Sequence, residues 1–189
     1  MEKTKRIYIL LSRTETMVAR IIRAIKGDGY SHVSIALSPT TDKFYSYGRR
    51  KIHNPLISGF IIENIHTGVF GNFPKSRSIL YSLDVSEEAY NAICKIIRYR
   101  LTHYRQSKYN FLGLFAMAVD IPIRSRTKFT CAQFAACTLS EARAASLPKD
   151  PYLMLPNDFA KIPGLKIIYE GPLKDCNFAA DNKVAATIL

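Results

Sequence analysis

Short apolar runs with alternating polar positions dominate the first half of the chain and predict β-strands. Residues 5–12 are rich in Ile, Leu and Tyr. In residues 30–37, alternation places aliphatic side chains on one face of a strand and His32 and Ser34 on the other. The same reading predicts further strands at residues 43–47, 60–65, 78–85 and 166–169.

Apolar residues recur at helical spacing in four other stretches. One covers residues 17–25, and another begins after Ser86, a good N-cap followed by two glutamates, and runs to about residue 104. Two more are predicted from residue 109 to before Pro122 and from residue 131 to about 144. Loops are predicted at residues 48–59, 68–75 and 124–128. These elements predict an α+β protein with an antiparallel sheet packed against helices.

The length of 189 residues predicts one domain, with a tail from about residue 176 that is expected to fray. Hydrophobic residues make up 48% and charged residues 22%, as in ordinary soluble domains. No apolar run is long enough to span a membrane, and the charged N-terminus lacks a signal-peptide pattern. We therefore expect no transmembrane segment and a cytoplasmic protein.

The formal net charge of +12 suggests attraction to nucleic acid, anionic lipid or an acidic substrate. The densest basic run is Arg49-Arg50-Lys51, and no basic block is interleaved with aromatic residues. This scatter favours a solvated basic surface and predicts no specific nucleic-acid partner. An anionic surface stays open as a partner.

The four cysteines (Cys94, Cys131, Cys137 and Cys176) include no C-x-x-C pair. Such spacing argues against a zinc site, and a reducing cytosol argues against a disulfide framework. We expect no metal and no cofactor.

The stretch 129–137 carries the strongest candidate chemistry. Thr130 reads as an N-cap, and Gln133 can complete a capping box with it. This places Cys131 in the first turn of a helix, where unpaired backbone N–H groups favour negative charge and therefore the nucleophilic thiolate. The alternative is a small buried hydrophobic residue, which is what most free cysteines are.

A His opening a strand (Ser31 to Leu37), followed much later by a Cys at a helix start, resembles the permuted branch of the NlpC-type papain-like superfamily. That branch includes the YiiX-like proteins and the relatives of lecithin–retinol acyltransferase. In ordinary papain-like enzymes the Cys helix precedes the His strand, and here the order is reversed. The resemblance runs from about His32 to Phe134 and implies a circularly permuted papain-like fold.

The resemblance also implies roles for individual residues. Cys131 corresponds to the nucleophile and His32 to the general base. Ser46 falls at the position of the polar residue that orients the imidazole, although a serine cannot stabilise an imidazolium as a carboxylate would. Tyr109 corresponds to a tyrosine whose hydroxyl can stabilise an oxyanion, as can the backbone N–H of Cys131.

Each of these residues also has a purely structural reading. His32 could be a hydrogen-bonded strand histidine, Ser46 a filler residue of a strand, and Tyr109 an aromatic anchor of the core. The other histidines (His53, His66 and His103) read as surface residues, and Cys94 and Cys137 as core residues.

Together these features predict a cysteine hydrolase (an amidase or peptidase) or acyltransferase that works through a thioester acyl-enzyme. Its substrate would be a small peptide, an amide or a lipid ester. The alternative is a non-catalytic binding module that keeps the papain-like fold.

Overall fold

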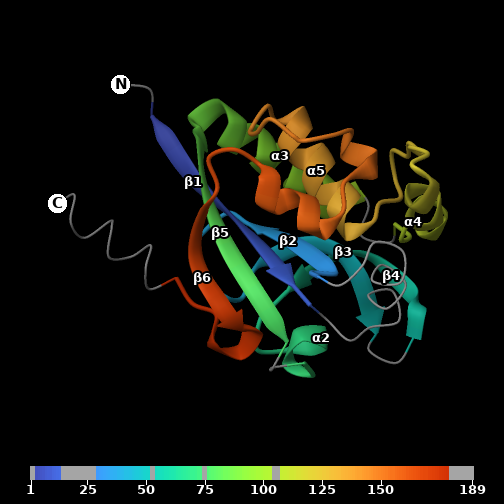
Figure 1. Cartoon of the computed structure of the whole chain (residues 1–189), viewed down its shortest axis with the longest axis horizontal. Coiled ribbons are helices and arrows are strands. Elements are labelled where there is room, and N and C mark those ends of the chain that lie inside the picture. The colour runs from blue at the N-terminus through green and yellow to red at the C-terminus, as the bar shows by residue number, and fades with distance from the viewer. Residues whose placement is uncertain (1–2, 14–28, 52–53, 74–75, 104–106, 179–189) are drawn as a thin grey trace.

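The computed structural model describes residues 3–13, 29–51, 54–73, 76–103 and 107–178 (Figure 1). Six strands form one sheet with the order β4-β3-β2-β1-β5-β6. Every neighbouring pair is antiparallel. The strands are β1 (Thr4–Ser12), β2 (His32–Ala36), β3 (Phe44–Lys51), β4 (Asn54–Glu63), β5 (Arg77–Ser86) and β6 (Lys166–Pro172).

Among the described residues there are four α-helices and four short 3₁₀ helices. The α-helices are α2 (Gly68–Gly71), α3 (Glu87–His103), α4 (Phe111–Ala116) and α5 (Cys131–Glu141). The 3₁₀ helices are η1 (Met117–Val119), η2 (Pro151–Leu153), η3 (Pro156–Lys161) and η4 (Leu173–Asp175). The α+β class with an antiparallel sheet is confirmed.

The sheet is covered on both faces. Figure 1 shows α3 and α5 together on one face, where their apolar residues join those of the central strands in the main core. On the other face, Phe70 of α2 and Leu173 of η4 pack with residues from β1, β3 and β5 in a second cluster. Burial on both sides explains why β1 is continuously buried from Ile7 to Ser12 instead of alternating.

Local sequence accounts for α3. The Ser86 hydroxyl accepts a hydrogen bond from the backbone N–H of Ala89 at 3.1 Å, and Glu87 and Glu88 occupy the first turn. The buried residues Ile93 and Ile97 then recur at helical spacing. The predicted helix after Ser86 is confirmed.

Several predicted boundaries are wrong. Residues 48–59 were expected to form a loop, but β3 continues to Lys51 and β4 already begins at Asn54, because the two strands extend each other's hydrogen-bonded ladder. The expected loop at residues 68–75 contains the short helix α2. The stretch from Tyr109 begins as an isolated bridge to Phe129 before α4 starts at Phe111.

The structure describes only residues 176–178 of the predicted frayed tail. Cys176 and Phe178 are buried in the second cluster, and the Phe178 ring packs edge-on against Tyr8 at 4.8 Å between centroids. Residues 179–189 and the predicted helix at residues 17–25 lie outside the described residues.

None of the helices in the described part of the chain is both long and apolar enough to cross a membrane.

Candidate active site

Cys131 is the first residue of α5, as its sequence pattern predicts. The Thr130 hydroxyl accepts a hydrogen bond from the backbone N–H of Gln133 at 3.1 Å, and the Gln133 side chain accepts one from the backbone N–H of Thr130 at 3.1 Å. This confirmed capping box fixes the point where the helix begins. It therefore fixes the place of the thiol, which is 2% exposed.

The buried side chain of Gln133 also ties two distant segments to this helix start. Its oxygen accepts from the Asn110 side chain at 3.0 Å, and its amide nitrogen donates to the backbone carbonyl of Tyr152 at 3.0 Å. The backbone N–H of Asn110 donates to the carbonyl of Phe129 at 3.0 Å. These bonds hold Tyr109 beside Cys131.

Cys131 is near enough to the hydroxyl of Tyr109 that both the side chain and the backbone of the cysteine affect the pKa of the tyrosine. The pKa of Tyr109 lies well above its usual value, first because the ring is buried and then because of its proximity to Cys131. The tyrosine therefore keeps its proton and can act as a hydrogen-bond donor. Tyr109 is one of the residues that the resemblance to the papain-like family singles out, and the structure brings it to the thiol.

His32 begins β2, so its ring lies at the end of a strand. The Nε2 atom lies 2.9 Å from Oε2 of Glu63, and the ring packs edge-on against Phe70 at 5.7 Å between centroids. The side chain of Cys131 is near enough to the same ring to raise the pKa of the imidazole. Because Glu63 occupies Nε2, Nδ1 is the nitrogen that can face the sulfur.

The charge state of His32 follows from these neighbours. Burial by itself lowers the pKa of the imidazole, but the Glu63 carboxylate and the Cys131 side chain outweigh it and raise the pKa from 6.5 to about 10. At neutral pH the ring is therefore an imidazolium beside the thiol.

Glu63 is the functional residue that the sequence reasoning missed. It is the last residue of β4, two strands away from β2 in the sheet. Its Oε2 accepts from His32 and also from the Ser34 hydroxyl at 2.5 Å. The sequence shows only that Glu63 is a carboxylate within a predicted strand. No local pattern predicts that this strand pairs with β3.

Glycine at position 48 leaves room for this contact across β3. A Cβ built on Gly48 would lie 2.7 Å from Cδ1 of Ile61, 3.5 Å from Cε1 of His32 and 3.8 Å from Oε1 of Glu63. A Cβ at position 48 would therefore clash with Ile61, and it would touch the His32 ring and the Glu63 carboxylate at ordinary van der Waals distance.

Ser46 does not take the orienting position predicted for it. It lies on β3, between the strands of His32 and Glu63, but its buried hydroxyl donates to the backbone carbonyl of Val33 at 2.7 Å. The contact to the His32 ring comes from Glu63, a carboxylate, in place of the predicted hydroxyl. Ser46 thus joins β3 to β2.

Two side chains, Arg100 and Tyr152, bind backbone carbonyls of the loop that precedes Cys131. Arg100 of α3 donates to the carbonyl of Arg126 at 2.7 Å, and its guanidinium lies over the Phe129 ring at 4.4 Å from the centroid. The Tyr152 hydroxyl donates to the carbonyl of Ser125 at 3.2 Å. Two hydrogen bonds therefore fix the position of the loop that precedes α5.

The remaining cysteines lie away from His32. Cys137 and Cys176 are buried, and burial raises the pKa of each thiol to about 12. Cys94 is half-buried on α3, and burial raises its pKa as well. His66 and His103 are exposed, as expected for surface residues, whereas His53 lies outside the described residues.

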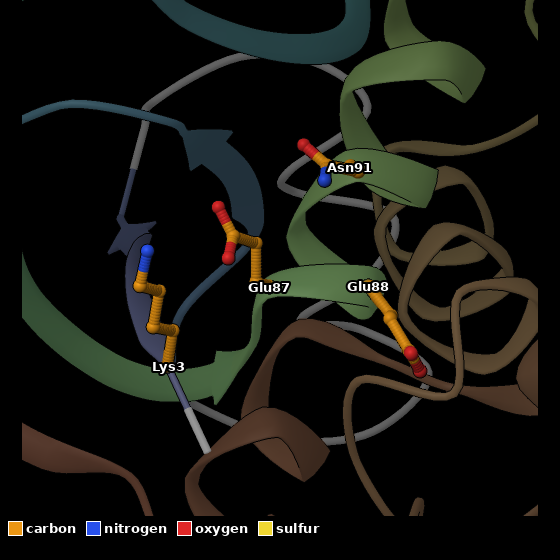
Figure 2. Close-up of a pocket in the computed structure, with 4 residues that line it drawn as sticks. All are labelled: Lys3, Glu87, Glu88 and Asn91. Atoms are coloured by element: carbon orange, nitrogen blue, oxygen red, sulfur yellow. The ribbon is translucent and has the colours of Figure 1, made fainter. Parts of the chain in front are cut away.

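A pocket of about 420 Å³ lies elsewhere, lined by Lys3, Glu87, Glu88 and Asn91. Figure 2 shows the Lys3 amine and the Glu87 carboxylate on facing sides of it, with Glu88 directed away from both. The pairing of Thr4 with Ser86 puts this pocket at one end of β1, whereas Ser12 pairs with His32 at the other end. The pocket is therefore separate from the cysteine site.

Within the described ranges, no group of three or more His, Cys, Asp or Glu side chains is arranged to hold a metal ion.

No protein-family model matches this chain, and a search of curated proteins finds no significant match.

Proposed function

We propose that the protein is a cysteine-dependent hydrolase or acyltransferase of a circularly permuted papain-like fold, acting on an amide or ester through a thioester acyl-enzyme. The observation that carries this proposal is the pairing of the His32 ring with Glu63 at 2.9 Å, together with the action of Cys131 on the pKa of the same ring. A nucleophile, a base and a group that orients the base are the three parts that such chemistry needs.

The reaction would begin with the thiolate of Cys131 and the imidazolium of His32. The sulfur attacks the substrate carbonyl carbon and forms a tetrahedral intermediate. The Tyr109 hydroxyl and the backbone N–H of Cys131 are the donors that can stabilise its oxyanion. His32 then gives its proton to the leaving amine or alkoxide, the bond from carbon to that group breaks, and a thioester remains on Cys131.

The second half of the reaction would use the same groups. Water, in a hydrolase, or another nucleophile, in an acyltransferase, attacks the thioester and loses its proton to His32. The carbon–sulfur bond then breaks and restores the thiolate–imidazolium pair. Glu63 would hold the ring in place and stabilise its positive charge in both halves.

The order of the parts along the chain supports the permuted fold. The histidine strand precedes the cysteine helix, and the helix packs against the face of the antiparallel sheet. The non-catalytic binding module drew its support from a weak orienting residue at Ser46. A carboxylate at the His32 ring removes that support and favours the enzyme.

The test is the alkylation rate of Cys131 by iodoacetamide as a function of pH, read by mass spectrometry of the labelled peptide. We expect fast labelling well below about pH 8.5, where an ordinary thiol ionises. His32→Ala should abolish this labelling at neutral pH. His103→Ala, which removes an exposed histidine on α3, is the matched control and should label like the unmodified protein.

A second measurement tests for the acyl-enzyme. Incubation with p-nitrophenyl acetate should leave an acetyl group on Cys131 and release nitrophenolate in a burst. If Cys131 reacts with neither reagent, or reacts equally well without His32, the enzyme proposal fails and the binding module replaces it.

A further inference from the structure

Residues 111–119 form a segment with no polar side chain, Phe-Leu-Gly-Leu-Phe-Ala-Met-Ala-Val. In the structure it makes α4 and η1. A helical segment that is apolar all round is normally buried within a protein or a membrane. Figure 1 shows α4 at the edge of the molecule, away from the centre of the sheet.

The side chains that the structure describes in this segment differ in their exposure. Leu114 and Met117 are buried against Leu153 and Leu155 in a small cluster of their own. By contrast, Leu112 is 69% exposed and Val119 is 67% exposed. Ile121, just after η1, is 55% exposed.

This concentration of exposed apolar side chains is unusual for the molecule. The described residues include six large exposed hydrophobic side chains, and three of them lie within residues 112–121. Single exposed apolar residues need no explanation, but a group of them marks an interaction surface.

Cations follow directly after the apolar residues. Arg124, Arg126 and Lys128 are all exposed, and Arg124 pairs with Asp150 at 2.7 Å. The backbone of their loop is held by the bonds from Arg100 and Tyr152 described above, so that these charges stand on a fixed support. Exposed apolar side chains bordered by cations match the boundary between the acyl chains and the anionic headgroups of a membrane.

We propose that residues 111–128 form a docking surface for an anionic membrane, with Leu112, Val119 and Ile121 in the headgroup boundary and Arg126 and Lys128 against the lipid phosphates. The net charge of +12 adds long-range attraction to such a surface. A second copy of the chain fits less well, because a two-fold contact would bring the same cations together. The proposal does not depend on the chemistry at Cys131.

The absence of tryptophan from the chain allows a direct test. Leu112→Trp creates a single fluorescent reporter in the proposed surface, and Ile167→Trp creates one at an equally exposed site on β6. On addition of vesicles made of equal parts phosphatidylcholine and phosphatidylglycerol, the emission at position 112 should shift to the blue and that at position 167 should not. Vesicles of phosphatidylcholine alone should give a much smaller shift.

Charge reversal tests the contribution of the cations Arg126 and Lys128 to membrane binding. The double variant Arg126→Glu/Lys128→Glu should weaken co-sedimentation with the anionic vesicles by about 25-fold or more, since each cation near a membrane contributes about fivefold. The double variant Lys95→Glu/Lys174→Glu, with both lysines exposed on other elements, makes the same change in net charge and should weaken it far less.

Three results would overturn the proposal. One is an unchanged emission at position 112, and another is equal loss of binding in the two charge-reversal variants. The third is a wild-type dimer on gel filtration that Val119→Asp converts to a monomer without any change in vesicle binding. That result would assign the surface to contact between copies of the chain.

Discussion

Helix α5 carries two buried cysteines in different chemical surroundings. Cys131 is its first residue, and Cys137 lies further along the same helix. Each has a tyrosine whose ionisation is linked to that of the thiol, Tyr109 in the first case and Tyr152 in the second. Burial and a tyrosine neighbour are therefore common to both thiols.

The difference between the two thiols is the imidazolium. His32, held by Glu63, reaches Cys131 at the helix start, where the backbone N–H groups also favour negative charge. No imidazole is among the groups that affect the pKa of Cys137, and burial raises the pKa of this thiol to about 12. A charged partner and a place at the helix start, more than burial, distinguish a candidate nucleophile from a core cysteine.

The largest expected effect is the difference in reactivity between these two thiols. At pH 7.5 iodoacetamide should label Cys131 more than a thousandfold faster than Cys137, because a thiol with a pKa of about 12 is almost entirely protonated. Peptide mapping of the native protein measures both rates at once. Cys131→Ser should remove the fast reaction, and Cys137→Ser should leave it intact.

The second effect is on the titration of His32. Its ring Cε1–H resonance in an NMR titration should keep the shift of an imidazolium through pH 8 and change only near pH 10. This corresponds to a proton affinity about 3,000-fold above that of an ordinary histidine. Glu63→Gln should move the transition to lower pH, since burial then opposes the charge with less compensation. A His32 resonance that titrates near pH 6.5 in the native protein would contradict the proposed ion pair.

The third effect separates the two tyrosines. Tyr109→Phe should slow acylation by p-nitrophenyl acetate about 100-fold, the loss typical for one oxyanion donor. Alkylation by iodoacetamide develops no oxyanion, and its rate should change much less. Tyr152→Phe, beside Cys137, is the matched variant: it removes the hydrogen bond to the Ser125 carbonyl and should change the two reactions of Cys131 by the same factor.

The smallest expected effect is on the alkylation rate of Cys131. The comparison is between Glu63, which contacts the His32 ring, and Ser46, which is predicted to do so from the sequence. Glu63→Gln should slow alkylation of Cys131 at neutral pH about tenfold, because it weakens the imidazolium that favours the thiolate. Ser46→Ala removes a hydrogen bond to a backbone carbonyl, which costs about 1 kcal/mol of stability, and should alter the alkylation rate less than twofold. Equal effects of the two substitutions would restore Ser46 as the orienting residue.

What the sequence predicts well is local. The capping box of Thr130 and Gln133 needs only four consecutive residues, and it places Cys131 correctly. The strand that His32 begins and the helix after Ser86 follow in the same way from short patterns.

What the sequence does not predict depends on pairing between distant strands. Glu63 reaches His32 only because β4, β3 and β2 lie next to one another with Gly48 at the crossing. The sequence predicts Ser46 near the correct ring, because β3 adjoins β2. Its hydroxyl, however, donates to the backbone carbonyl of Val33. The packing of neighbouring strands determines which partner a small polar side chain binds. The alternation of polar and apolar residues along the sequence does not predict that partner.

The distribution of the site along the chain also has a consequence during synthesis. His32 and Glu63 leave the ribosome well before Cys131, whose helix is followed by η2, η3, β6, η4 and the C-terminal residues. The histidine and glutamate can therefore meet within a growing sheet while the thiol is still absent. The proposed reactive pair can form only after α5 has docked, so we expect a chain in which this helix has not yet docked to carry an ordinary thiol at position 131.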